Sequence, residues 1–334
     1  MQLPTHDDVA AASQRLHGRI VRTPMLRNAL LDQITGAAVL LKPECLQRTG
    51  SFKLRGATNA VLQLSEAQRR AGVVTFSSGN HGQAIACAAS GVGAAATVFM
   101  PADAPAVKRE STERWGARIV PYDRATEDRD ALAQAYVART GAALVPPFDH
   151  PHVVAGQGTL ALELAADAAD EGLRMDAMLV CTGGGGMIAG CALALEGASP
   201  GTQVFAVEPA GWDDTGRSLR SGMREVNPPG GSLLCDALLA PAPGVLTFAV
   251  NQPRLAGGIA VTDAEVLAAM AFAFTHLKLV VEPGGAVCLA ALLSGRFAAR
   301  GQVVGAVLSG GNVDAAVFAR ALAASPLPAA ATVC

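Results

Sequence analysis

Continuous apolar runs alternate with segments of helical pattern along most of the chain. Runs of this kind, without polar residues in every second position, are typical of strands covered on both faces, as in parallel sheets. The predicted strands are 39–43, 73–76, 95–100, 118–121, 144–145, 177–181, 204–208 and 303–308; the predicted helices are 56–70, 81–90, 107–115, 128–139, 158–171, 186–195 and 263–276. This alternation predicts an α/β protein with parallel sheet.

The strand and helix segments fall into two sets. Residues 72–149 carry their own strand–helix units, which predicts a small mobile domain inserted in a large domain made of residues 1–71 and 150–325. Neither an internal repeat nor a low-complexity linker separates the two. The tail, 326–334, is expected to fray.

Composition narrows the class of protein. The 334 residues are 51% hydrophobic and 16% charged with a net charge of −2, which excludes an intrinsically disordered chain. Lys and Arg are scattered, so we expect no nucleic-acid partner. No uninterrupted apolar run reaches membrane-spanning length, and the N-terminus lacks a signal-peptide pattern. The seven cysteines form no CxxC pair, which favours free thiols in the cytoplasm.

Glycine-rich turns carry the strongest local signal. Thr182-Gly-Gly-Gly-Gly186 directly follows a predicted strand and opens a predicted helix. Free backbone amides and the helix N-terminus would favour an anion there, and a phosphate group fits best. A dinucleotide is the rival ligand, because Gly184, Gly186 and Gly190 precede Glu208 at about the distance of a Rossmann fingerprint.

Other turns suggest a different ligand. Lys53 follows Gly50, Ser51 and Phe52 at a predicted helix start, where the helix dipole would lower its pKa and favour the neutral amine needed for a Schiff base. The turn at 77–83 suits a carboxylate, and a further turn follows the last strand at 309–312. Glycines at 156–158 and 284–285 are expected to approach the same ligand. Turns at strand ends are predicted to converge on one crevice.

Together these motifs resemble the fold-type II pyridoxal-phosphate enzymes, in the branch of threonine/serine dehydratases and serine racemases. The resemblance runs from Thr23-Pro24 to Ser309-Gly-Gly-Asn312 and includes the segments Lys42–Gln47, Ala155–Thr159 and Glu282–Ala286. It implies two open, twisted, mainly parallel sheets covered by helices, a tryptophan synthase β-like architecture with a large and a small lobe. It also implies a homodimer.

The resemblance assigns site roles to matching positions. Lys53 would bind the cofactor as a Schiff base and take the α-proton of the substrate. The residues expected around the cofactor are Phe52 beside the ring, Asn80 at the ring oxygen, Gly183, Gly184, Gly185, Gly186 and the amide of Met187 at the phosphate, and Ser309 at the pyridine nitrogen. The residues expected around the substrate are Ser77, Ser78, Asn80, His81 and Arg129.

The implied activity is a pyridoxal-phosphate dependent dehydratase, or ammonia-lyase, of β-hydroxy amino acids. Threonine, serine, 3-hydroxyaspartate and β-aryl serines share the reacting core, and each would give a 2-oxo acid and ammonia by α,β-elimination. A neutral Ser309 would leave the pyridine unprotonated, a weaker electron sink that favours elimination over transamination.

Two alternative functions stay open. In the racemase branch, Ser78 would be the acid/base on the ring face opposite the lysine, so serine racemase is the nearer alternative. An NAD-dependent oxidoreductase, from the glycines around position 186 and Glu208, is the distant one.

The resemblance also implies a divalent cation. In the racemase branch the ligands are an acid, a backbone carbonyl four residues later and an acid six residues later, which here are Glu208, Trp212 and Asp214. These oxygen ligands suit Mg²⁺ or Ca²⁺.

Overall fold

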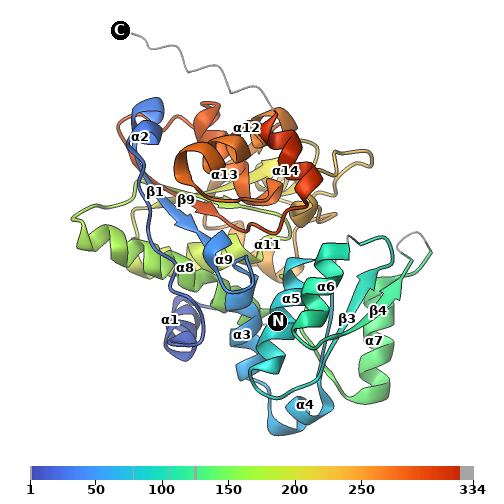
Figure 1. Ribbon diagram of the computed structural model, residues 1–334. Coiled ribbons are helices and arrows are strands. Elements are labelled where there is room, and N and C mark those ends of the chain that lie inside the picture. The colour runs from blue at the N-terminus through green and yellow to red at the C-terminus, as the bar shows by residue number, and fades with distance from the viewer. Residues whose placement is uncertain (1, 78, 105, 124–125, 324–334) are drawn as a thin grey trace.

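Two parallel sheets organise the molecule (Figure 1). The computed structural model describes residues 2–77, 79–104, 106–123 and 126–323. The larger sheet has the order β1-β9-β6-β7-β8, from β1 (Ala38–Pro43), β9 (Val303–Leu308), β6 (Ala177–Cys181), β7 (Gln203–Pro209) and β8 (Leu255–Val261). The smaller has the order β4-β3-β2-β5, from β4 (Arg118–Tyr122), β3 (Ala96–Pro101), β2 (Val73–Phe76) and β5 (Ala143–Leu144). Every neighbouring pair is parallel, which confirms the predicted fold class.

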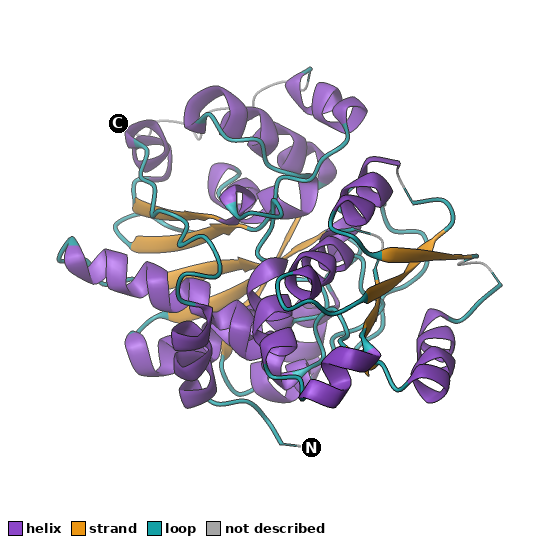
Figure 2. Ribbon diagram, turned by 60° about the horizontal axis from the view of Figure 1, so that its bottom comes forward, coloured by secondary structure: helices purple, strands orange, loops and turns teal. Residues whose placement is uncertain are grey.

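Helices cover both faces of the larger sheet, as the strand layer in Figure 2 shows. On one face α8 and α9 pack on the strands and on α1; on the other lie α12, α13 and α14. The helices of this part are α1 (His6–Leu16), α2 (Ala29–Thr35), α8 (Pro151–Asp170), α9 (Gly186–Ala198), α10 (Asp214–Ser221), α11 (Val245–Asn251), α12 (Asp263–Phe272), α13 (Pro283–Leu293) and α14 (Ala315–Leu322), with single turns η1 (Glu44–Leu46), η2 (Asp236–Leu238) and η3 (Ala273–Leu277).

The smaller sheet has its own helices and its own core. Helix α5 packs on β2 and β3, and α7 packs on β2 and β5. The helices here are α3 (Lys53–Leu62), α4 (Glu66–Ala71), α5 (Asn80–Ser90), α6 (Ala106–Arg114) and α7 (Arg129–Thr140). Leu54, Ala57 and Val61 of α3 pack into the same apolar cluster as Ile85 and Val98, so α3, which packs on α5, shares the core of the smaller sheet although it precedes residue 72.

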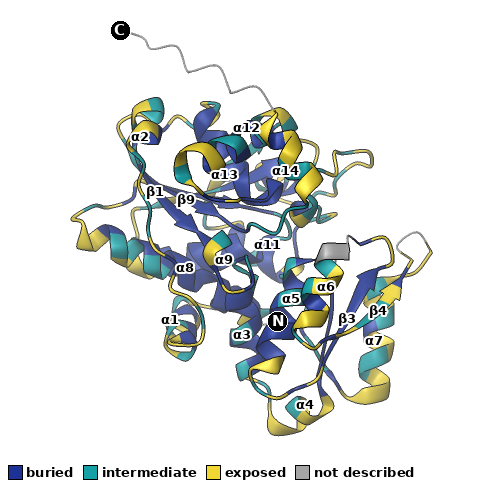
Figure 3. Ribbon diagram, in the orientation of Figure 1, coloured by how far each residue is buried: buried dark blue, intermediate teal, exposed yellow. Residues whose placement is uncertain are grey.

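Burial follows the sequence pattern closely for most strands (Figure 3). Strands β2 and β6 have the predicted bounds, and all of their residues are buried. Strand β8 was not predicted, because it lies at the sheet edge, is only partly buried and contains Gly257 and Gly258. The expected helix 56–70 is two helices, because Ser65 caps α4 in a capping box with Gln68 and so begins a new helix.

The prediction that glycines 156–158 form a turn near a ligand was wrong. Both glycines lie inside α8, where two other helices cross it closely. A Cβ on Gly158 would lie 2.3 Å from the carbonyl oxygen of Gly190, and one on Gly156 would lie 2.7 Å from Cα of Gly56. These glycines allow backbones to touch at helix crossings, so part of the glycine excess serves packing.

A buried ionic cluster ties α3 to α8 and to the end of β1. The Arg55 guanidinium, fully buried, donates to both carboxylate oxygens of Glu44 at 2.8 Å and of Glu163 at 2.7 and 2.8 Å. The buried Lys42 ammonium also donates to Glu163, at 2.7 Å. These carboxylates raise the pKa of Arg55, so its charge is permanent.

Within the described residues, no helix combines the length and the apolar character that crossing a membrane requires.

Candidate active site

The carboxyl ends of β6 and β9 and the first turns of α3, α5 and α9 surround one pocket. Its lining includes almost all of the predicted site residues that the structure describes: Phe52, Lys53, Ser77, Asn80, His81, Arg129, Gly183, Gly184, Gly185, Gly186, Met187 and Ser309. Ser78 lies outside the described residues. The expected juxtaposition of separate turns at strand ends is therefore found, and the roles of the individual residues stay predictions.

Lys53 begins α3 and points into this pocket. Its Nζ donates to the carbonyl oxygen of Pro147 at 2.8 Å and lies 5.1 Å from the centre of the Phe52 ring. Burial lowers the pKa of Lys53 to about 8, against the opposing effect of Glu282. The direction agrees with the sequence prediction, and the cause found in the structure is burial, which removes water from the ammonium. A lysine with this pKa supplies the neutral amine that reacts with a carbonyl.

The glycine loop between β6 and α9 turns its carbonyls away from the pocket. Thr247 Oγ1 donates to the Gly184 carbonyl at 2.7 Å, and Asn251 Nδ2 donates to the Gly185 carbonyl at 3.3 Å. Throughout the described chain, the amides of Gly183 to Gly186 donate to no carbonyl or side chain. Four free amides at the start of a 13-residue helix suit a phosphate group.

Glycine is required at two points of this loop. Gly185 has φ +88°, and a Cβ there would meet Asn251 at 2.9 Å. A Cβ on Gly184 would lie 2.4 Å from the ring of Phe148, which packs directly on the loop. Any side chain at either position would therefore distort the loop.

The turn before α5 forms the opposite wall. Ser77 Oγ accepts the amide of Gly79 at 3.1 Å, and the buried His81 ring bonds the Val145 carbonyl through Nε2 at 3.0 Å. Burial, with the nearby Lys53, lowers the pKa of His81 to about 3, so its imidazole is neutral. Arg129, the first residue of α7, places its guanidinium 5.1 Å from the Phe76 ring centre.

Asn80 contacts Glu282, a residue to which the sequence alone assigned no role. Asn80 Nδ2 donates to Glu282 Oε1 at 2.6 Å, and its Oδ1 accepts from Asn312 at 2.7 Å. The second amide hydrogen of Asn80 remains for a ligand. Burial, and then Asp236, raise the pKa of Glu282 to about 8, so it is protonated at neutral pH. Its buried Oε2 has no partner in the described structure, as expected where a polar ligand completes the site.

Sequence reasoning missed three further pocket residues besides Glu282. Phe148 covers the glycine loop, and Lys108 of α6 forms an ion pair with Asp236 of η2 across the pocket. Lys108 lies in a charged surface-like helix, and no local pattern distinguishes it. Glu282 begins the motif 282–286, so the sequence pointed to its position, but the sequence does not reveal its contact with Asn80.

The predicted cation ligands form a buried acidic pair. Glu208 ends β7, with its carboxylate oxygens accepting the amides of Thr215 and Gly216 at 2.8 Å each. Burial and the charge of Asp214 raise the pKa of Glu208 to about 8. Asp214 Oδ1 accepts from Asn227, whereas its buried Oδ2 has no partner among the described residues. An unpartnered oxygen beside a second carboxylate fits a hard cation.

Few other described side chains near Glu208 and Asp214 could serve as cation ligands. The Trp212 indole donates to the Ser232 carbonyl at 2.8 Å, so only the backbone carbonyl of Trp212 could serve as a ligand. In the described part of the chain, no group of three or more His, Cys, Asp or Glu side chains comes together as a metal cluster.

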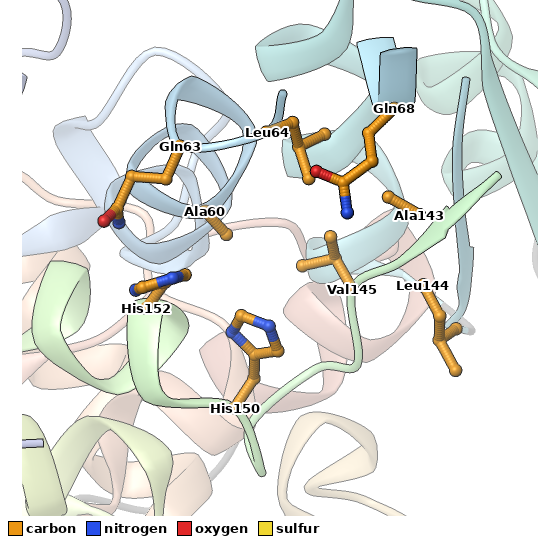
Figure 4. A pocket seen from close by; sticks show the side chains of 9 residues that line it. All are labelled: Ala60, Gln63, Leu64, Gln68, Ala143, Leu144, Val145, His150 and His152. Carbon is orange, nitrogen blue, oxygen red and sulfur yellow. The ribbon is translucent and has the colours of Figure 1, made fainter. Parts of the chain in front are cut away.

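A separate cavity of about 220 Å³ lies between α3, β5 and the start of α8 (Figure 4). Two histidines, His150 and His152, face it, with ring centres 5.4 Å apart. Burial lowers the pKa of His150 to about 4. His150 is half-buried and His152 is exposed, and neither lines the Lys53 pocket.

The chain matches the family model described as "Pyridoxal-phosphate dependent enzyme" over residues 16–310. It belongs to this family of pyridoxal-phosphate dependent enzymes. It is 44% identical to an L-threo-3-hydroxyaspartate ammonia-lyase of Pseudomonas sp, over 96% of this chain and 99% of the relative. It is 40% identical to a serine racemase of Schizosaccharomyces pombe, over 96% of this chain and 98% of the relative.

A solved structure of a threonine deaminase from T.th. is similar to this pyridoxal-phosphate enzyme with a TM-score of 0.87 and 41% identity, covering 93% of this chain and 99% of that one. The predicted family, the fold-type II architecture and the ammonia-lyase class of carbon–oxygen lyases are confirmed.

The distant alternative, an NAD-dependent oxidoreductase, was wrong. Glu208, the acid expected to bind a ribose, is fully buried, and its carboxylate oxygens accept the backbone amides of Thr215 and Gly216 instead. The family match assigns that loop to a pyridoxal-phosphate enzyme instead.

Proposed function

We propose that this enzyme removes water and then ammonia from a β-hydroxy amino acid to give a 2-oxo acid. The observation that carries the proposal is the pairing of Lys53, a buried lysine of lowered pKa, with four free glycine amides in one pocket. Relatives named as ammonia-lyases of hydroxyaspartate support the same reaction.

The residues present fit pyridoxal phosphate. The amides of Gly183 to Gly186 and of Met187 would hold its phosphate, Phe52 and Asn80 would hold the ring, and Ser309 would face its nitrogen. When bound, the cofactor supplies an electron sink for the charge that develops at the substrate α-carbon.

Lys53 would then move the proton. Its amine would act as the general base that takes the α-proton in this pocket. The turn at Ser77–His81 would bind the α-carboxylate at the N-terminus of α5, with Ser78 as a proposed participant. Ser309, a hydroxyl rather than a carboxylate, would leave the ring nitrogen unprotonated and so favour elimination.

A substrate panel tests this proposal. The purified holoenzyme, incubated with L-serine, L-threonine, L-threo-3-hydroxyaspartate and a β-aryl serine, is expected to release equal amounts of 2-oxo acid and ammonia from at least one of them. Chiral chromatography of the serine reaction measures the alternative, serine racemase, which the Schizosaccharomyces pombe relative suggests. Formation of D-serine without 2-oxo acid would replace the proposed function by that alternative.

We further propose a divalent cation, Mg²⁺ or Ca²⁺, between Glu208, the carbonyl of Trp212 and Asp214. Removal of the cation is expected to lower the melting temperature by several degrees, because two buried carboxylates would lose their counter-charge. Differential scanning fluorimetry with and without a chelator measures this. The variant Asp214→Asn should no longer respond to the chelator, and an unchanged melting temperature in the wild type would contradict the site.

The quaternary state and the compartment are also proposals. Exposed Phe274 and Leu322, with Phe318 between them, form an apolar surface that supports a homodimer. The free cysteines support the reducing cytoplasm. Light scattering that gave a single-chain mass, near 33.9 kDa, would contradict the homodimer.

A further inference from the structure

The ion pair between Lys108 and Asp236 lies at the mouth of the active-site pocket. It joins α6, which packs with the smaller sheet, to η2, which packs on α13 of the larger one. The Lys108 side chain is only 11% exposed, whereas that of Asp236 is 39% exposed. The lysine is therefore held inside the pocket and its partner stands toward solvent.

Lys108 is close to the expected position of the substrate carboxylates. Its Nζ lies 3.5 Å from the place that a Cβ would occupy on Gly79, in the turn proposed to bind the α-carboxylate. Lys108 and Asp236 act on the pKa of Glu282 in opposite directions, so all three lie within electrostatic range of one another. An anion bound beyond the α-carboxylate would meet the Lys108 ammonium.

The charges that line the pocket favour a ligand with a second carboxylate. Lys108 and Arg129 are cationic and Asp236 is anionic. His81 and Glu282 are neutral near pH 7, since their pKa values are about 3 and about 8. Excess positive charge in a partly enclosed site favours a ligand with two negative charges over one with a single charge.

A second cavity provides a place for Asp236 when it is displaced. This outer cavity, of about 440 Å³, shares Lys108 and Asp236 with the pocket and is also lined by Ser232, Asn312 and Arg320. An Asp236 side chain that left Lys108 would face water and the Arg320 guanidinium there. The exchange would therefore leave neither charge buried and unpaired.

We propose that Lys108 is the residue that recognises the β-carboxylate of a β-hydroxy dicarboxylic amino acid, and that Asp236 occupies this subsite until the substrate replaces it. This inference rests on the proposed function and names its substrate class. Arg129 lines the same pocket and adds to its positive charge.

The test compares two substrates that differ only at the β-carboxylate, L-threo-3-hydroxyaspartate and L-serine. In Lys108→Met, the ratio of their kcat/KM values is expected to fall about 100-fold, mainly through the KM for hydroxyaspartate. In Asp236→Asn, the same ratio is expected to rise, because the competing anion is gone. Lys278→Met, which removes an exposed ammonium elsewhere, is the matched control and should keep the wild-type ratio.

A binding measurement separates this inference from the proposed function. Calorimetry should show that Lys108→Met weakens the binding of succinate, which has two carboxylates, and leaves the binding of butyrate, which has one, unchanged. If the wild type released no 2-oxo acid from any substrate of the panel, the proposed function would fail, and succinate binding would still test Lys108. If Lys108→Met weakened both acids equally and lowered both kcat/KM values equally, Lys108 would be structural and the inference would be wrong.

Discussion

Replacement of Lys53 by alanine is expected to lower kcat for ammonia release by at least about 10⁴-fold, because the amine proposed to bind the cofactor and to take the α-proton is lost. Lys108, the other lysine that lines the pocket, is paired with Asp236 and packed against Gly79, so it is not placed to substitute. A coupled ammonia assay measures the loss. Borohydride treatment of the wild type, followed by peptide mapping, should place the reduced cofactor on Lys53.

The matched control for this prediction is Lys278→Ala. Lys278 is outside the pocket, and its ammonium donates to the Thr275 carbonyl of its own turn. The control should keep wild-type kcat. A Lys53→Ala enzyme that retained one tenth of the activity, or a borohydride label on another lysine, would show that the assignment of Lys53 is wrong.

Replacement of Arg55 by methionine is expected to lower the free energy of unfolding by about 3–5 kcal/mol, the usual result of removing one partner of a buried ion pair. Arg55 is fully buried, and without it the buried Glu44 carboxylate would lose its charged partner and Glu163 would keep only its ion pair with Lys42. Because α3 begins at Lys53, the loss is expected to lower cofactor affinity as well. Urea denaturation followed by circular dichroism measures the free energy.

An exposed ion pair provides the control for Arg55. Arg254 pairs with Glu196 at 3.2 Å, with side chains 29% and 54% exposed. Because water screens such a pair, Arg254→Met should change stability by less than about 1 kcal/mol. Equal effects of Arg55→Met and Arg254→Met would mean that the buried cluster contributes no more than a surface pair.

The strands could be predicted because burial on both faces leaves a direct record in the sequence. Strands β2 and β6 are wholly buried, and each was predicted with its observed bounds. Strand β8 departs from this rule, since it is at the edge of the sheet and carries two adjacent glycines. A Cβ added to Gly258 would lie 2.5 Å from Cα of Gly216 in α10. No local sequence pattern reveals this close approach.

The glycines show how far a local signal can be interpreted. In the loop at 183–186, glycines at the end of a strand leave free amides for a ligand, as expected from their position. In α8, Gly156 and Gly158 serve another purpose: they allow the backbones of neighbouring helices to come into contact. Which partner a glycine meets depends on the packing of distant elements, so sequence alone placed both sets near the ligand.

The sequence by itself determined the parallel α/β architecture, the family, and the turns that carry Lys53 and the glycines proposed to bind a phosphate. Each depends on residues within a few positions of one another, where burial and backbone conformation act locally. Only the tertiary structure decided why the pKa of Lys53 is lowered, that Glu282 holds Asn80, and that Lys108 meets Asp236, 128 residues away. The charge and hydration of a pocket depend on side chains brought together from several elements, because electrostatic interactions act through space rather than along the chain.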